Sequence, residues 1–486
     1  MKPKVILTLV LFGLFASTLN ARGIDDQHSA DKVNALINDA ESKGLSGYVL
    51  VVSEGEALLS RGVGYRSREK NTANTADTVF DIGSNTKQFT ATAIMQLVEA
   101  GQLEVDQPLS DFFARISRAK SGLTIHQLLT HTSGFEASSG RDFDMLSKQE
   151  FLEQVLHTPL EFEPGSRYQY SNVGYSVLAA VIELVSNSDY ETYLQNALFS
   201  KAGMSQTGYL KPKWREDQIA TGYYRGYRNI GNIIDRYQAD GVSWNLVGNG
   251  GIQSTANDLN KWFVALQSGK ILSKASIDLM LSAHAKYPDI DWYYGYGWSN
   301  GVTEGGIKVA AHNGSNGVYW SSIFWVPERD LFVSFSTNSE MESTAQIGQE
   351  IRRILMNPEY QTEAIAYDIY WELVSYIGSH KVVDIAALKS FLSSRNLVPE
   401  EPSAFNRIGL WAMDNDLGDW GVSLLEENIA MFPLDGNLYD SLGEAYLISG
   451  NKEKARVNFG RALELGSGSD CGWCANSRAK LEQLEN

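Results

Sequence analysis

The secondary-structure pattern of this chain changes near residue 356, and that change constrains the possible folds more than any other feature. Before this point, strand patterns and helical patterns alternate along the sequence. Beyond it, strand signals fade and apolar residues recur at helical spacing. Because 486 residues exceed the size of an ordinary single domain, we expect two domains, one at residues 25–355 and one at residues 362–486.

The first domain is expected to have an α+β fold. Residues 46–65 have the alternation of a β-hairpin, and residues 318–325 and 331–336 have that of a second strand pair around a Pro-containing turn. Residues 86–101 carry apolar side chains at helical spacing and end in a glycine. Further helices are expected at residues 175–185 and 256–267. Hairpins at both ends with helices between them indicate an antiparallel sheet that packs against a helical region.

A repeat with a 34-residue offset marks the second domain. When the chain is aligned on itself with this offset, Gly409 pairs with Gly443, and other small and large positions also coincide. This pattern is typical of tetratricopeptide-like helix pairs, in which small residues let two helices approach closely. Two copies are fewer than a free-standing array needs, so helices at residues 362–395 and 475–485 are expected to complete an all-α stack. The stack either binds a protein partner in a groove or stabilises the first domain by packing.

The amino terminus predicts export. Lys2 and Lys4 precede an apolar run at residues 5–16, and small residues follow up to Ala21, which is the pattern of a cleaved secretory signal. A run of about a dozen apolar residues is shorter than the roughly 20 that span a bilayer. We therefore expect a signal peptide at residues 1–21, a periplasmic or secreted location, and no stable membrane span.

Charge and residue types exclude several partners. A net charge of −17 argues against a nucleic-acid partner, because nucleic-acid affinity depends on clustered Lys and Arg. The seven His residues show no metal-binding pattern or cluster, so we predict no metal and no cofactor. Cys471 and Cys474 are spaced C-x-x-C, which is compatible with a small local disulfide or with a redox motif; we favour a structural role.

Ser84 and Lys87 form the first motif with a chemical meaning. Ser84 is expected at the start of a helix, and Lys87 follows three residues later on the same helix face. Backbone N–H groups at a helix start favour a nucleophile there, and a neighbouring amine can help to remove the serine proton. Alone, the S-x-x-K pattern is weak, and a serine cap with a solvated lysine would be the preferred interpretation without support from other motifs.

Two further motifs follow in order along the chain. Residues 170–172 read Tyr-Ser-Asn, and residues 312–315 read His-Asn-Gly-Ser. Together with S-x-x-K they resemble the class C β-lactamases, D,D-peptidases and related esterases, whose three elements are S-x-x-K, Y-x-N and K/H-x-G. Similar stretches occur at residues 123–134, 250–259 and 294–298, so the resemblance covers roughly residues 30–350. Within them, His131 and Gly134 are expected to be helix-end structure, not catalytic groups.

This resemblance implies a β-lactamase/transpeptidase-like fold and a serine hydrolase that works through an acyl-enzyme. Ser84 would be the nucleophile and Lys87 the neighbour that activates it. Tyr170 would act as a phenolate or as a hydrogen-bonded relay that carries the serine proton to the leaving group. The resemblance thus assigns catalysis to three side chains and requires no cofactor.

The resemblance also implies how the substrate is held. Asn172 would donate a hydrogen bond to the substrate, and His312 would line the opposite wall of the cleft. The backbone N–H groups of Ser84 and Ser315 would form the oxyanion hole, and Gly314 would keep the strand edge open to the substrate.

The third motif departs from the Lys-Thr-Gly of many relatives. His312 and Asn313 weaken the charge and the hydroxyl that help to hold a β-lactam carboxylate, whereas a neutral His suits uncharged esters and amides. With an ordinary pKa near about 6.5, His312 would make carboxylate binding pH-dependent. We expect hydrolysis of an ester, an amide, a β-lactam or a D-amino-acid peptide. The alternatives are a penicillin-binding sensor, or a scaffold whose repeat tail binds a partner protein.

Overall fold

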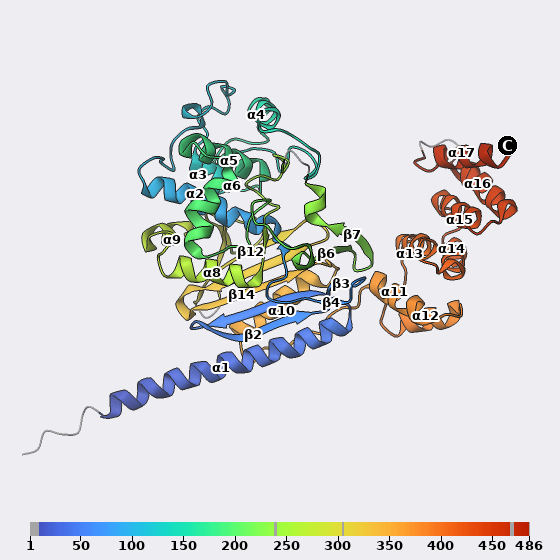
Figure 1. The fold of residues 1–486 in the computed structure, drawn as a ribbon, viewed down its shortest axis with the longest axis horizontal. Helices are drawn as coiled ribbons and strands as arrows, with labels where there is room; N and C mark the ends of the chain where they lie inside the picture. Colours follow the sequence, from blue (N-terminus) through green and yellow to red (C-terminus); the bar gives the residue numbers. More distant parts are fainter. Residues whose placement is uncertain (1–8, 238–240, 304–305, 467–470, 486) are drawn as a thin grey trace, which may run out of the picture. The chain divides into compact units, whose positions relative to one another are not determined.

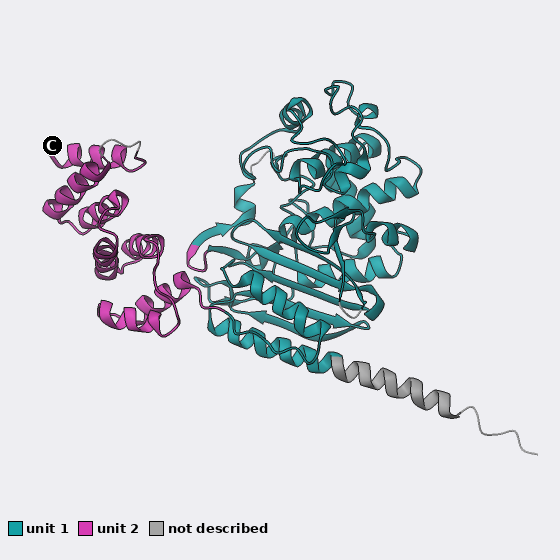
Figure 2. Ribbon diagram, turned by 180° about the vertical axis from the view of Figure 1, so that it is seen from behind, with its two compact units in different colours: residues 1–224, 229–365 teal, residues 225–228, 366–486 magenta. Residues whose placement is uncertain are grey.

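The computed structural model describes residues 9–237, 241–303, 306–466 and 471–485. The chain divides into two compact units (Figure 2). Unit 1 comprises residues 1–224 and 229–365, and unit 2 comprises residues 225–228 and 366–486. The predicted signal peptide falls on residues 1–8, which lie outside the described residues, and on residues whose side chains are not described. Within the described ranges, no helix combines the length and the hydropathy needed to cross a membrane.

An eight-stranded antiparallel sheet forms the centre of unit 1 (Figure 1). The strand order is β2-β1-β14-β13-β12-β11-β10-β9. The bounds are β1 Gly47–Ser53, β2 Glu56–Val63, β9 Ala285–Lys286, β10 Tyr293–Tyr294, β11 Ser299–Val302, β12 Lys308–Ser315, β13 Trp320–Val326 and β14 Leu331–Thr337. Both predicted hairpins are confirmed, as β1–β2 and β13–β14. The two ends of unit 1 also meet in this sheet, because Gly47 pairs with Thr337 and Ser53 pairs with Leu331.

Helices cover both faces of the sheet (Figure 1). Helices α1 (Leu9–Ser42) and α10 (Thr344–Met356) cover one face, where a core cluster includes Val33 and Ile351. The larger core, on the other face, joins helices α2 (Thr86–Glu99), α5 (Asn172–Ser186) and α8 (Ala256–Gln267) to the sheet. Side chains alternate between the faces of a strand, so in β13 Phe324 belongs to the first core and Ile323 and Trp325 to the second. The α+β fold is confirmed.

Shorter helices and strands complete unit 1. The helices are α3 Ile125–Leu129, α4 Lys148–His157, α6 Tyr190–Leu194, α7 Ser200–Ala202 and α9 Lys274–Met280, and the short strands are β3 Tyr65–Ser67, β4 Thr72–Ala73, β5 Phe80–Asp81, β6 Thr221–Tyr224, β7 Arg228–Asn232 and β8 Gln253–Ser254. Strand β5 leads into a 3₁₀ turn, η1 (Gly83–Asn85), and then into α2. The helix predicted at residues 86–101 is confirmed as α2, and Gly101 follows it with a φ of +67°, as a glycine can at a helix end.

Over residues 366–485, the described part of unit 2 is helical. Its helices are α11 Ile369–Ser379, α12 Ile385–Ser393, α13 Ser403–Met413, α14 Gly418–Met431, α15 Gly436–Ile448, α16 Lys452–Gly466 and α17 Cys474–Glu485. A Cβ atom on Gly409 would lie 2.7 Å from Leu425 of the next helix, and one on Gly443 would lie 2.7 Å from Phe459. These glycines therefore allow close packing within the pairs α13–α14 and α15–α16. The helical extension is confirmed, and its assignment to tetratricopeptide repeats stays a prediction.

A disulfide joins Cys471 and Cys474, with their Cα atoms 5.5 Å apart. It closes a short loop at the start of α17. The pair therefore forms the small local disulfide that its spacing allows.

Phe89 anchors helix α2, and its removal should destabilise unit 1. Its ring is buried and meets Phe199 and Trp262 edge-on, each with ring centroids 4.9 Å apart. We expect Phe89→Ala to lower the free energy of unfolding by about 3–5 kcal/mol, because it leaves a cavity in a packed core. Val98→Ala, at a half-buried position of the same helix, should cost only about 1 kcal/mol. Urea unfolding of the full chain measures both, and equal losses would contradict this account of the packing.

Candidate active site

Ser84 and Lys87 lie where β5 turns into α2. Ser84 belongs to the turn η1, two residues before the start of α2, and it is partly exposed. Lys87 belongs to the first turn of α2 and is completely buried. The Lys87 Nζ lies 3.1 Å from the Ser84 Oγ, so the buried amine is within hydrogen-bonding reach of an accessible hydroxyl.

Two carbonyl oxygens hold the Lys87 amine. Its Nζ lies 2.7 Å from the Asn172 Oδ1 and 2.7 Å from the backbone oxygen of Asn249. Burial lowers the pKa of Lys87 well below its ordinary value, although the negative charge of Asp142 opposes this shift. A neutral amine has two N–H groups and one lone pair. When the two carbonyl oxygens accept the N–H groups, the lone pair is left for the hydroxyl of Ser84.

Tyr170 completes this group of three side chains. Its hydroxyl is hydrogen-bonded to Ser84, and the Lys87 Nζ lies 4.6 Å from the centre of its ring. Burial raises the pKa of Tyr170, and the bond to Ser84 offsets only part of that rise. The neutral phenol is therefore favoured over the phenolate, and of the two predicted roles the geometry fits the hydrogen-bonded relay.

His131 holds the segment that carries Tyr170. Its ring lies 4.3 Å from the ring of Tyr170, measured between centroids, and its Nδ1 accepts a hydrogen bond of 3.1 Å from the backbone N–H of Ser171. The Ser171 side chain in turn accepts from Gly174 and caps α5, so Asn172 is the first residue of that helix. His131 thus has the structural role that the sequence predicts, but it acts at the site itself, through a contact between rings that no motif spacing indicates.

His312 is buried in strand β12. Its Nδ1 lies 2.7 Å from the backbone oxygen of Asn313, and its Nε2 lies 3.0 Å from the Tyr294 hydroxyl. The Nδ1–H therefore donates to the carbonyl, and Nε2 accepts from Tyr294. Burial is the largest cause that lowers the pKa of His312, to about 3. The expectation that His312 titrates near neutral pH and makes carboxylate binding pH-dependent is wrong, because the buried imidazole stays neutral.

Two glycines allow the turn η1, which carries Ser84, to lie against strand β12. A Cβ atom on Gly314 would lie 2.0 Å from the Ile82 oxygen and 2.7 Å from the Ser84 nitrogen. A Cβ atom on Gly83, whose φ is +52°, would lie 2.8 Å from the Ser315 nitrogen. Only hydrogen atoms fit between these backbones. Ser84 and Ser315 therefore line the same hollow, where two backbone N–H groups could act as donors to one oxygen.

Two carboxylates line this hollow, and a third contacts one of its lining residues. Among the described residues that line it, Asp81 and Asp142 are acidic and none is basic. Asp81 accepts hydrogen bonds from the Gly83 N–H and from Asn316, and burial raises its pKa to about 6. The Ser315 hydroxyl donates to a third carboxylate, Glu340. Sequence reasoning did not single out these three acidic residues, although Asp81 stands only three positions before Ser84.

Comparison with known proteins identifies the family. A profile of the family described as Beta-lactamase matches residues 33–354. The chain belongs to this family. It is 30% identical over 334 residues to a Bacillus subtilis (strain 168) protein provisionally named as a penicillin-binding protein, PbpX, a match that covers 68% of this chain and 80% of PbpX.

Solved structures agree with this family. The octameric penicillin-binding protein homologue from Pyrococcus abyssi matches with a TM-score of 0.60 and 27% identity, over 73% of this chain and 82% of that one. The penicillin-binding protein from Bacillus halodurans matches with a TM-score of 0.57 and 29% identity, over 66% of this chain and 99% of that one. The predicted family and fold are confirmed, and members of this family are in general serine hydrolases.

A methyl group on Gly314 should disable the site. We expect Gly314→Ala to slow the labelling of the protein by a fluorophosphonate about 100-fold, because the new Cβ pushes β12 away from η1 and separates the two N–H donors. Gly122→Ala serves as the control, because nothing lies within 4 Å of a Cβ atom at that exposed position. Intact mass against time measures both rates. Unchanged labelling of a folded Gly314→Ala protein would contradict this interpretation.

Proposed function

We propose that this protein is an exported serine hydrolase that cleaves an ester or an amide through an acyl-enzyme on Ser84. The observation that carries the proposal is the 3.1 Å contact between the buried Lys87 amine and the partly exposed Ser84 hydroxyl. A base with a lowered pKa beside an accessible hydroxyl is what nucleophilic catalysis by serine requires. Export rests on the amino-terminal sequence pattern.

Acylation uses the neutral Lys87 amine as the base. As the Ser84 Oγ attacks the substrate carbonyl carbon, the serine proton passes to the Lys87 lone pair. The carbonyl oxygen becomes an oxyanion and accepts hydrogen bonds from the N–H groups of Ser84 and Ser315. Donors fixed before the reaction stabilise this charge without reorganisation, and one such donor typically contributes about 3 kcal/mol to barrier lowering.

Breakdown of the tetrahedral intermediate needs a proton for the leaving group. Tyr170 is a neutral phenol beside Ser84. It gives its proton to the leaving oxygen or nitrogen and receives in exchange the proton that Lys87 has taken. The bond between carbonyl carbon and leaving group then breaks, and the acyl group stays on Ser84. A water molecule attacks this acyl-enzyme with the same groups acting in reverse, which releases the acid and restores the serine hydroxyl.

The charges around the hollow favour neutral or cationic substrates. Asp142, Asp81 and Glu340 are acidic, and His312 is neutral because its pKa is about 3. A substrate carboxylate beside the scissile bond would lose hydration without gaining a cationic partner in its place. Among the substrates that the sequence suggests, uncharged esters and amides therefore fit best, and β-lactams and peptides with a free carboxylate next to the scissile bond fit less well.

Intact mass spectrometry tests the nucleophile. After brief exposure to a fluorophosphonate, and separately to a penicillin, the wild type should carry one adduct that Ser84→Ala lacks. Nitrophenyl ester hydrolysis should fall at least about 1,000-fold in Ser84→Ala. A long-lived penicillin adduct without ester turnover would favour the alternative of a penicillin-binding sensor, and an unmodified, inactive wild type would refute the hydrolase.

A series of nitrophenyl esters that differ only in charge tests the substrate class. We expect kcat/KM to be highest for a trimethylammonio-acyl ester, intermediate for the uncharged acyl ester of equal length, and at least about tenfold lower for the ester with a terminal carboxylate. Asp142→Asn should reduce the differences in kcat/KM among the three esters. A preference for the anionic ester would contradict the substrate assignment and leave the nucleophile assignment intact.

The acidic limb of the pH profile should report on Lys87. Because the reaction needs the neutral amine, kcat/KM for an uncharged ester should rise as the pH rises through the pKa of Lys87. The Asp142 charge raises that pKa, so Asp142→Asn should move the acidic limb to lower pH. Asp144→Asn, an exposed residue of the same loop, should leave the limb in place. A shift to higher pH in Asp142→Asn would show that Lys87 is not the titrating base.

A further inference from the structure

Asp81 is a buried acidic residue to which the proposed reaction steps give no role. It ends strand β5, three residues before Ser84, and only 3% of it is exposed. None of the ion pairs among the described residues includes it, and the charge of Asp142 opposes its ionisation by raising its pKa further. Removing a carboxylate from water is costly unless other groups stabilise its charge, so hydrogen bonds have to hold the ionised form.

Each oxygen of the Asp81 carboxylate accepts a hydrogen bond from a different segment. The Gly83 N–H donates to Oδ1 at 2.6 Å, and the side-chain amide of Asn316 donates to Oδ2 at 2.9 Å. Gly83 precedes Ser84 in the turn η1, and Asn316 follows Ser315, the last residue of β12. The carboxylate therefore joins the two segments that carry Ser84 and Ser315.

The side-chain amide of Asn316 has a fixed orientation. Its Oδ1 accepts hydrogen bonds from the backbone N–H groups of Val318, at 3.1 Å, and Tyr319, at 2.9 Å. If the amide turned over, its NH₂ group would face these two donors, and its oxygen would face the Asp81 carboxylate. Asn316 therefore presents a donor to Asp81, and the contact requires an acceptor at position 81.

The backbone on both sides of this contact is anchored. The main chain of Asp81 pairs with Gln253 of β8, and the Asn316 N–H donates to the Tyr319 oxygen at 3.2 Å. Between the two segments, Gly83 and Gly314 supply no side chain that could set a spacing. A hydrogen bond between two anchored side chains can therefore fix the separation of η1 from the end of β12.

We propose that Asp81 is a positioning residue: its carboxylate holds η1 against the end of β12 and so fixes the distance between the Ser84 and Ser315 N–H groups. It acts through Gly83 and Asn316, not on the substrate. The inference rests on the proposed acyl-enzyme reaction, in which these two N–H groups stabilise the oxyanion. A larger separation weakens one of the two hydrogen bonds to the oxyanion, which slows the reaction with little effect on the binding of a neutral substrate.

Exchange of the two side chains tests the contact. In Asp81→Asn, one NH₂ group faces another donor, so the hydrogen bond with Gly83 or with Asn316 is lost. In Asn316→Asp, two carboxylates face each other. In the double variant, the new amide at position 81 donates to the new carboxylate at position 316, whose other oxygen still accepts from Val318 and Tyr319. The exchange restores the contact with donor and acceptor reversed and leaves the number of charges unchanged.

Steady-state hydrolysis of an uncharged nitrophenyl ester by the full-length variants gives the measurement. We expect each single variant to lower kcat and kcat/KM about 30-fold with KM unchanged, and the double variant to return to within about threefold of the wild type. If Asp81 acted by its charge alone, Asp81→Asn would be faster than the wild type, because a carboxylate beside the hollow disfavours an oxyanion. Asn316 is partly exposed, so Asn316→Asp tests the contact even where Asp81→Asn does not fold.

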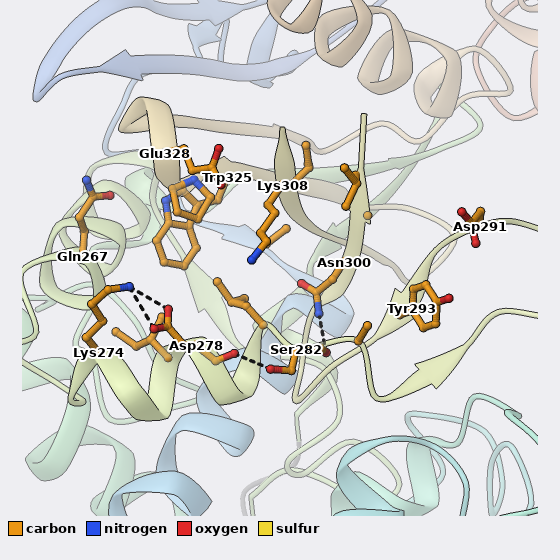
Figure 3. Close-up of a pocket in the computed structure, with 18 of the residues that line it drawn as sticks. Gln267, Lys274, Asp278, Ser282, Asp291, Tyr293, Asn300, Lys308, Trp325 and Glu328 are labelled. Atoms are coloured by element: carbon orange, nitrogen blue, oxygen red, sulfur yellow. Dashed lines mark hydrogen bonds and ion pairs between the residues drawn. The ribbon is translucent and has the colours of Figure 1, made fainter. Parts of the chain in front are cut away.

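Two further variants are controls. Asn257 donates to Asp77 at 2.7 Å through the same kinds of side chain, at an exposed position four residues before Asp81, so Asp77→Asn should leave kcat unchanged. Asp278 lines a separate cavity that shares no lining residue with the hollow at Ser84 (Figure 3). Asp278→Asn removes one acidic charge there and should also leave kcat unchanged. Urea unfolding of every variant shows that it is folded.

Three results would overturn the positioning role. They are an unchanged or increased kcat in the folded single variants, a loss that the double variant does not restore, and a loss that lies in KM instead of kcat. The wild type separates these results from the hydrolase. If Ser84 is labelled and the ester is hydrolysed, any of the three removes only the role of Asp81, whereas an unlabelled, inactive wild type removes both proposals.

Discussion

Burial of the Lys87 amine is the constraint on which the site depends. An amine removed from water must find hydrogen-bond partners nearby, and three segments that are distant in the sequence supply them. Ser84 comes from the turn before α2, Asn172 from the first turn of α5, and Asn249 from the loop before β8. The packing of these segments around one nitrogen atom therefore fixes where the nucleophile lies relative to both helices.

The same burial disfavours the charged forms of the groups at the centre of the site, whereas carboxylates line the hollow beside them. Lys87 and His312 have lowered pKa values, and Tyr170 has a raised one. The surrounding hollow has Asp81 and Asp142 in its lining. The K/H-x-G element allows a lysine at this position, whereas this chain has a buried imidazole with a lowered pKa there. The electrostatic character of the site thus follows from solvent exclusion as much as from residue type.

Sequence reasoning was most successful where the pattern of side-chain types determines the structure or the chemistry. The hairpins and α2 followed from periodicity, and the linear order of three motifs identified the family. Sequence reasoning was less successful where a backbone atom or a loop residue supplies the contact. Asn249 holds Lys87 through its carbonyl oxygen, which any residue has, and Asp142 reaches the hollow from a loop without a motif. The pairing of Asn300 with Ala310, and of Ala310 with Trp325, depends on strand register, which single-strand patterns do not determine.

The close approach of Gly83 and Gly314 has a consequence for folding. These residues are far apart in the sequence, and β12 reaches the nucleophile turn from a sheet in which β1 pairs with β14. Contacts between distant segments form slowly, since a long loop must close before they provide any stabilisation. Before residues 331–337 have been synthesised, β1 lacks one of its two neighbours. The appearance of a reactive Ser84 should therefore mark one of the last steps in the folding of unit 1, after the local contacts of its helices have formed.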